Sequence, residues 1–162
     1  MEKSPVLIGL VGLGMFGVIG LHLAAAVQQM RKDQAARPAA QAQAPIAEGF
    51  VYACAVSDIP ENRAKMLIIG GENIALFKYE GKLSAVHNLC KHQNGPLSEG
   101  KIIDGCITCP WHGYQYLPEN GQSPPPFTEK VCTYDVRVEG DRVFVNPKPY
   151  PEGTARPPAV IL

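Results

Sequence analysis

The sequence carries no excess of charge of either sign. Its 15 lysine and arginine residues balance 15 aspartate and glutamate residues, so the formal net charge at pH 7 is zero. Proteins dedicated to nucleic-acid binding usually show a basic stripe or patch. The charge balance therefore argues against DNA or RNA as a partner.

The sequence also lacks a regular cysteine framework. The five cysteines are Cys54, Cys90, Cys106, Cys109 and Cys132. An odd number without regular spacing is a poor match to the disulfide framework of a small secreted domain. A metal site that uses two of the cysteines and leaves three as free thiols is the simpler explanation.

A recognisable catalytic grouping is missing as well. The sequence shows no nucleophile paired with an acid or base, and no loop insertion large enough to form a substrate site. We therefore do not expect the chain to be a complete enzyme.

Charged and strongly polar residues are absent from residues 6–21. A helix over residues 6–30 would be about 37 Å long, which is enough to cross a bilayer. We therefore predict a transmembrane helix within residues 1–30. A cleaved signal peptide is the alternative, because Ala24-Ala25-Ala26 offers a small-residue cleavage pattern.

The predicted membrane helix has unequal charge on its two flanks. The N-terminal flank carries Lys3, and the C-terminal flank carries Arg31, Lys32 and Arg37. Positive residues favour the cytoplasmic side of a membrane. Free cysteines also suit a reducing compartment. The chain is therefore predicted to be a single-pass membrane protein whose following domain faces the cytoplasm.

Composition changes twice after the predicted helix. Residues 31–48 are rich in Ala, Gln and Pro, and Pro38 and Pro45 disfavour helix, so this stretch is predicted to be a linker. Residues 49–148 contain strand-like runs and are predicted to form one domain. Residues 149–162 are again proline-rich and are predicted to form an extended tail.

The predicted domain consists of short runs of β-branched and aromatic residues. There are six such runs, at residues 50–56, 65–70, 74–79, 83–89, 132–138 and 142–146. Turn signals at Glu80-Gly81-Lys82 and Glu139-Gly140-Asp141 join neighbouring runs as hairpins. We therefore predict an all-β fold built from antiparallel strands.

Two short motifs pair a cysteine with a histidine. Cys90-x-His92 and Cys109-x-x-His112 are separated by sixteen residues. Thiolate and imidazole ligands suit zinc or an iron–sulfur centre. Zinc fingers usually pair cysteine with cysteine and histidine with histidine on separate elements, whereas each loop here supplies one of each. That arrangement favours a binuclear centre in which both cysteines bind one iron and both histidines bind the other, and a structural zinc site stays open as an alternative.

In these motifs and the residues around them, the sequence resembles the Rieske [2Fe–2S] family. The flanking residues are Gly95-Pro96 in the first loop, and Pro110 and Gly113 in the second. The resemblance implies a small antiparallel Rieske-type β-sandwich or barrel with a cluster-binding subdomain, preceded here by the predicted transmembrane α-helix. It implies a [2Fe–2S] cluster as cofactor. The implied cluster ligands are Cys90, His92, Cys109 and His112.

Residues around the implied ligands separate this sequence from one branch of the family. Rieske proteins of bc-type complexes carry a further cysteine in each loop, and these form a disulfide; Gly95 and Trp111 occupy those positions here. Tyr114 matches a serine that hydrogen-bonds a bridging sulfide, and Tyr116 matches a tyrosine that donates to a cysteine sulfur. Pro125 belongs to a proline loop that resembles the family's cover over the cluster. The sequence thus looks more like ferredoxin-type Rieske domains, and we expect a potential below that of bc-type centres.

The apolar N-terminal segment and the Rieske resemblance together predict a membrane-anchored electron-transfer subunit. It would carry one electron at a time within a larger membrane redox complex that contains a cytochrome-type partner. Its partners would then be the lipid bilayer and membrane-embedded redox subunits. One alternative is a ferredoxin component that delivers electrons to an oxygenase. The other, without redox activity, is a structural zinc domain.

Overall fold

The computed structural model describes residue 28 and residues 49–162. The predicted transmembrane helix and the predicted linker lie outside the described residues, apart from residue 28. Within the part of the chain that is described, no helix is long and apolar enough to cross a membrane. The domain boundaries expected at residues 30, 48 and 148 stay predictions.

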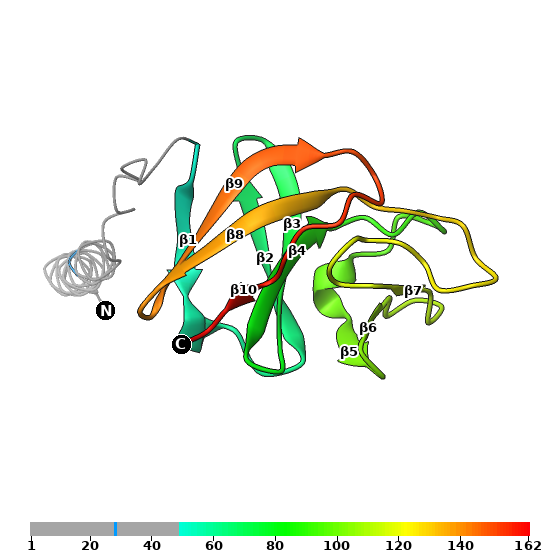
Figure 1. The fold of residues 1–162 in the computed structure, drawn as a ribbon, viewed down its shortest axis with the longest axis horizontal. Coiled ribbons are helices and arrows are strands. Elements are labelled where there is room, and N and C mark those ends of the chain that lie inside the picture. The colour runs from blue at the N-terminus through cyan, green and yellow to red at the C-terminus, as the bar shows by residue number, and fades with distance from the viewer. Residues whose placement is uncertain (1–27, 29–48) are drawn as a thin grey trace, which may run out of the picture. The chain divides into compact units, whose positions relative to one another are not determined.

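The larger of two antiparallel sheets contains seven strands (Figure 1). Its strand order is β1-β9-β8-β4-β3-β2, and β10 pairs with β4 beside this path. The two end strands, β1 and β2, contact each other, so the sheet curls into a near-barrel. The strands are β1 (Val51–Ala55), β2 (Arg63–Ile69), β3 (Glu72–Tyr79), β4 (Lys82–His87), β8 (Thr133–Glu139), β9 (Arg142–Tyr150) and β10 (Ala159–Val160). The all-β antiparallel fold is confirmed.

The two predicted hairpins are present. In the β3–β4 turn, Tyr79 pairs with Lys82, and the two residues between them, Glu80 and Gly81, have φ angles of 46° and 69°. Two positive φ angles are what a two-residue hairpin turn of type I′ requires. The β8–β9 turn likewise has Gly140 at a φ of 60°. These turns fix the register of the central strands.

Strand β3 is buried on both faces. Ile74 and Leu76 point into one apolar core, between the strands of the near-barrel. Ala75, Phe77 and Tyr79 point the other way, into a second core that the ligand loops share. A strand covered on both sides has a nearly continuous apolar sequence instead of an alternating one, which explains the run Ile-Ala-Leu-Phe.

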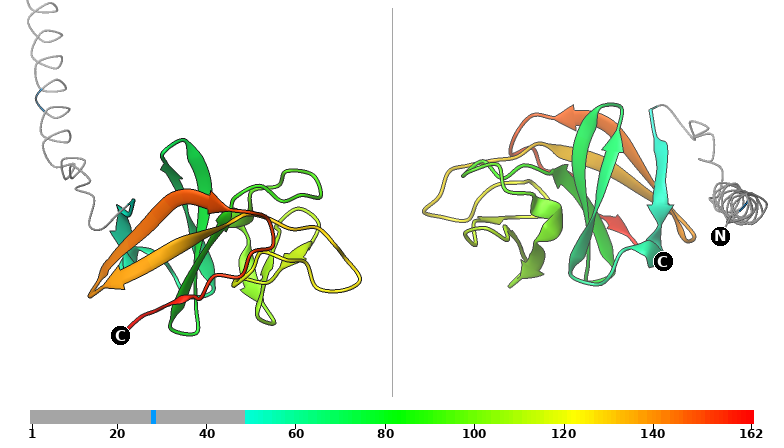
Figure 2. Two further views of the ribbon diagram at one scale, coloured as in Figure 1. Left: turned by 45° about the horizontal axis from the view of Figure 1, so that its top comes forward. Right: turned by 180° about the vertical axis from the view of Figure 1, so that it is seen from behind.

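The second sheet has three short strands, β5 (Lys101–Ile103), β6 (Cys106–Thr108) and β7 (Gln115–Tyr116). Together with the 3-10 helix η2 (Leu97–Glu99), it forms the subdomain that is predicted to bind the cluster, which lies on the right in Figure 1. Strands of two or three residues are too short for a periodic pattern, and the sequence did not predict them. Figure 2 shows the same subdomain from two further directions, always at one end of the curled sheet.

The C-terminal segment contributes to the large sheet at two places. Strand β9 extends to Tyr150, four residues beyond the predicted end at residue 146. Near the terminus, β10 pairs with the start of β4, with Ala159 opposite Leu83. The predicted extended tail therefore contains a strand of its own.

Candidate metal centre

The two ligand loops have the same backbone design. In the first loop, the Cys90 N–H donates to the Gly95 carbonyl (2.9 Å) and the Asn94 N–H donates to the Cys90 carbonyl (2.7 Å). In the second, the Cys109 N–H donates to the Tyr114 carbonyl (2.8 Å) and the Gly113 N–H donates to the Cys109 carbonyl (3.1 Å). Each bond thus spans five or four residues in both loops. Each loop is closed on itself with its cysteine at the base.

A left-handed residue completes each loop at the equivalent position. The fourth residue after the cysteine is Asn94 in the first loop and Gly113 in the second, with φ angles of 60° and 72°. Asparagine and glycine are the residues that adopt this conformation most readily. The two loops therefore turn in the same way and bring their cysteines toward each other.

The two cysteines lie side by side at the inner end of the site. Their exposed fractions are 1% for Cys90 and 4% for Cys109, and neither is in a disulfide. Burial, together with the neighbouring Cys90 thiol, raises the pKa of Cys109. Two buried thiols without a disulfide between them are well placed to bind one metal ion.

The two histidines lie at the outer end. His92 and His112 are both exposed, and their ring centroids are 5.0 Å apart with the rings perpendicular. The donors are thus separated into an inner sulfur pair and an outer nitrogen pair, as a [2Fe–2S] centre with mixed ligation needs. Among the described residues, no three His, Cys, Asp or Glu side chains form a group that could hold a single metal ion.

The Tyr116 hydroxyl reaches the first cysteine. Its oxygen lies 3.4 Å from Cys90 Sγ and accepts a hydrogen bond from the Lys91 N–H at 2.9 Å. Tyr116 is fully buried, and burial raises the pKa of its hydroxyl, which therefore keeps its proton. Because the Lys91 N–H occupies one lone pair, the hydroxyl proton is free to point at the sulfur. This is the geometry expected of a donor to a thiolate.

Tyr114 is directed elsewhere. Its ring stacks on His92, with centroids 5.3 Å apart and planes 10° apart, and its hydroxyl donates to the Glu129 carboxylate. Burial and the Glu129 carboxylate raise the pKa of Tyr114 to about 12. The sequence did not predict the Glu129 contact, because nothing in the sequence links two residues fifteen positions apart. Tyr114 therefore packs on the predicted ligand His92, and its hydroxyl proton is directed to Glu129.

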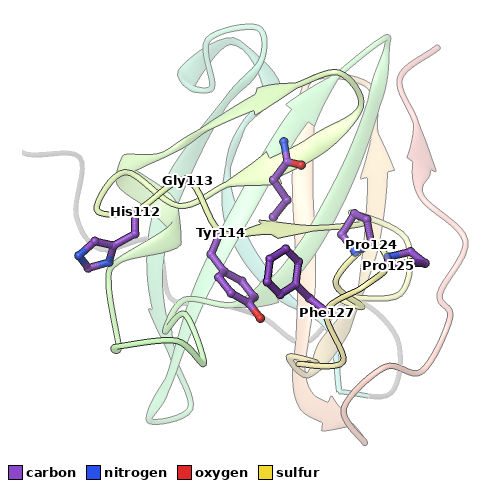
Figure 3. A pocket seen from close by; sticks show the side chains of 7 residues that line it. His112, Gly113, Tyr114, Pro124, Pro125 and Phe127 are labelled. Carbon is purple, nitrogen blue, oxygen red and sulfur yellow. The ribbon is translucent and has the colours of Figure 1, made fainter.

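The proline loop lies against the second ligand loop. A hollow of about 150 Å³ separates them, lined by His112, Tyr114, Pro124, Pro125 and Phe127 among others (Figure 3). In that view the rings of Tyr114 and Phe127 lie together, with centroids 4.9 Å apart, and Pro124 and Pro125 lie beyond them. Pro125 is exposed, as expected for the outer cover of the site.

A glycine and a tryptophan meet at the two positions that correspond to the disulfide of bc-type Rieske proteins in the resemblance described above. A Cβ atom added at Gly95 would lie 2.9 Å from Cys109 Sγ and 3.1 Å from the Trp111 ring. The indole therefore covers the Gly95 backbone, although 56% of Trp111 remains exposed. Packing of the indole on Gly95 joins the two loops at this place.

The protein family described as the Rieske [2Fe-2S] domain matches residues 49–135, which is more than half of the chain. The chain belongs to the Rieske [2Fe–2S] family. The cofactor of this Rieske domain is a [2Fe–2S] cluster, and the thiol and imidazole pairs fit it. The assignment of its individual ligands stays a prediction.

Several relatives share most of their length with this Rieske domain. The ferredoxin component of the alkene monooxygenase system of Xanthobacter autotrophicus is 33% identical over 65% of this chain and 88% of its own length. The ferredoxin subunit of the Escherichia coli K12 3-phenylpropionate/cinnamic acid dioxygenase is 36% identical over 59% and 92%. In structure, the ferredoxin of carbazole 1,9a-dioxygenase from Nocardioides aromaticivorans covers 61% of this chain and 98% of its own, at 24% identity and a TM-score of 0.57. That likeness shows a shared fold.

These relatives correct three predictions made from the sequence. Their names describe ferredoxins of oxygenase systems, which contradicts the interpretation of this Rieske protein as a membrane-anchored subunit with a cytochrome-type partner. The predicted single-pass membrane localisation, with the domain on the cytoplasmic side, is contradicted with it. The physical reason is that the apolar length of residues 6–30 bears on whether a segment can span a bilayer. It carries no information on which protein meets the cluster end of the domain.

Proposed function

We propose that this Rieske protein is a ferredoxin that delivers electrons one at a time to an oxygenase component. The observation that carries the proposal is the identity of 33–36% to ferredoxins of oxygenase systems, over about nine-tenths of their own length. The match covers most of the length of those ferredoxins, and both ligand loops lie within the residues that match the Rieske family, 49–135. When bound, the [2Fe–2S] cluster accepts and releases single electrons.

In this proposal Cys90 and Cys109 hold the inner iron, and His92 and His112 hold the outer one. The two thiolates lie in the apolar interior, where burial keeps water away from the sulfur atoms. Two thiolates with two neutral imidazoles leave the site less negative than four thiolates would, so an electron is accepted more easily. The exposed imidazoles give a partner protein the shortest approach.

Direct electron transfer tests the proposal. The full chain with its cluster is reduced, freed of excess reductant and mixed without oxygen with an oxidised oxygenase component from the same organism. We expect the EPR signal of the reduced ferredoxin to disappear as the oxygenase becomes reduced. An oxidised sample of the same protein is the control, and it should leave the oxygenase unchanged. Failure to reduce any oxygenase component of that organism, with the cluster intact, would overturn the proposal.

A further inference from the structure

Residues 151–157, here called the C-terminal strap, contact the cluster-binding subdomain at several points. The strap begins one residue after β9 and lies beyond the segment 49–135 that defines the family match. We propose that the strap is a working part of the metal centre, which positions the first ligand loop and the proline loop and sets the charge beside the cysteine ligands. The inference rests on the ligand assignment of the proposed function.

The first contact is an ion pair next to the ligands. The Glu152 carboxylate pairs with the Lys91 ammonium group, and Lys91 stands between the predicted ligands Cys90 and His92. The backbone N–H of Lys91 also holds the Tyr116 hydroxyl, which reaches Cys90. The strap thus holds the side chain of Lys91, whose backbone N–H binds Tyr116. The negative charge of Glu152 compensates the positive charge of Lys91 beside the predicted ligands.

The second contact is at the base of the proline loop. The Gln122 side-chain amide donates to the Gly153 carbonyl at 2.8 Å, and the Gly153 N–H donates to the Val131 carbonyl at 3.2 Å. Gln122 and Lys130 pair with each other as the two ends of that loop. Gly153 fits against both, because an added Cβ would lie 2.5 Å from the Lys130 side chain and 3.3 Å from Gln122. The strap therefore clamps the proline loop at the point where its two ends meet.

The strap is itself anchored to the large sheet. The Arg156 guanidinium donates to the Asp135 carboxylate (2.7 Å) and lies over the Tyr150 ring, whose hydroxyl donates to the other Asp135 oxygen (2.8 Å). The Thr133 hydroxyl donates to the Thr154 carbonyl at 2.8 Å. The Arg156 N–H also donates to the Glu119 carbonyl at 2.7 Å, in the segment before the proline loop. The strap thus connects strand β8 to both the first ligand loop and the proline loop.

The electrostatic part is tested by the reduction potential of the full chain. Glu152→Gln leaves the Lys91 charge uncompensated, and a positive charge near the cluster favours its more negative, reduced state. We expect a higher midpoint potential, with a difference that shrinks as salt is added because both side chains are exposed. Glu139→Gln is the control, because it changes net charge equally at the β8–β9 turn, at the opposite end of the sheet (Figure 1).

The positioning part is tested by two truncations. A chain that ends at Tyr150 loses the strap and β10, whereas a chain that ends at Pro157 loses only β10 and the residues beside it. We expect a chelator to remove iron several-fold faster from the shorter chain than from the longer one. Equal rates, or a potential in Glu152→Gln no higher than in Glu139→Gln, would overturn the proposal. Either result leaves the electron-transfer experiment unaffected, so failure of the strap and failure of the ferredoxin function are distinguishable.

Discussion

The Tyr116 hydroxyl is a side-chain polar group within reach of a predicted sulfur ligand, Cys90. Removing it in Tyr116→Phe should lower the reduction potential, because the hydrogen bond to Cys90 stabilises the more negative, reduced state. A hydrogen bond to a charged group contributes roughly 1.5–3 kcal/mol, and part of that acts on the reduced state. A redox titration measures the shift.

Tyr79→Phe is the matched control for Tyr116→Phe. Tyr79 is buried in the same core, but its hydroxyl bonds to Ser84 at 2.9 Å. Its replacement should leave the potential unchanged. An unchanged or raised potential in Tyr116→Phe would count against the donor role of Tyr116.

Single ligands can be tested against a neighbouring thiol. The reduced protein should give a rhombic EPR signal typical of mixed cysteine and histidine ligation, and Cys109→Ala should abolish it. Cys106→Ala should keep the signal, because Cys106 is not among the predicted ligands. It lies in β6, opposite Ile103 of β5. Iron retention and an unaltered signal in Cys109→Ala, or zinc without acid-labile sulfide in the wild type, would contradict the ligand assignment.

At the scale of elements, the contact between the two ligand loops depends on the absence of one side chain. Gly95→Ala would place a methyl group 2.9 Å from Cys109 Sγ and 3.1 Å from the Trp111 ring, so one loop must move away from the other. We expect faster loss of the cluster on heating, and the decay of its visible absorption measures this loss.

Gly105→Ala separates this effect from general destabilisation. Gly105 has a φ of 77°, so alanine there costs about 1–2 kcal/mol, but its added Cβ has open space around it. The Gly105 variant should therefore lose global stability and keep its cluster while folded. If the two variants lost the cluster equally fast at equal stability, the packing of Gly95 would not be what holds the loops together.

For the whole molecule, the large sheet was predictable because its strands are long enough to show their pattern. The run 74–79 lies within β3, and the runs 50–56 and 132–138 differ from β1 and β8 by one residue at either end. Strands β5, β6, β7 and β10 have two or three residues each. Backbone pairing with neighbours, and not local composition, decides such short strands, so the sequence did not indicate them.

The site likewise contains residues that the sequence indicates and residues that only the fold brings in. Cysteine and histidine within three positions of each other reveal a pair of ligand loops, and Tyr116 lies close enough to Cys109 to belong to the same motif. Glu129 and Glu152 reach the site only through the folded chain, from the end of the proline loop and from the strap. Their charges are ordinary surface charges in the sequence. Likewise, the partner of the cluster end could not be predicted from the apolar segment that precedes the domain.

The burial of β3 on both faces has a consequence for how the molecule unfolds. The near-barrel and the cluster-binding subdomain pack against opposite faces of one strand, with Ile74 and Leu76 on one face and Phe77 on the other. Neither half can unfold without exposing apolar residues of the other, so we expect the two to unfold as a single cooperative unit. Loss of the ligand loops' packing is thus felt in the stability of strands that contact no ligand.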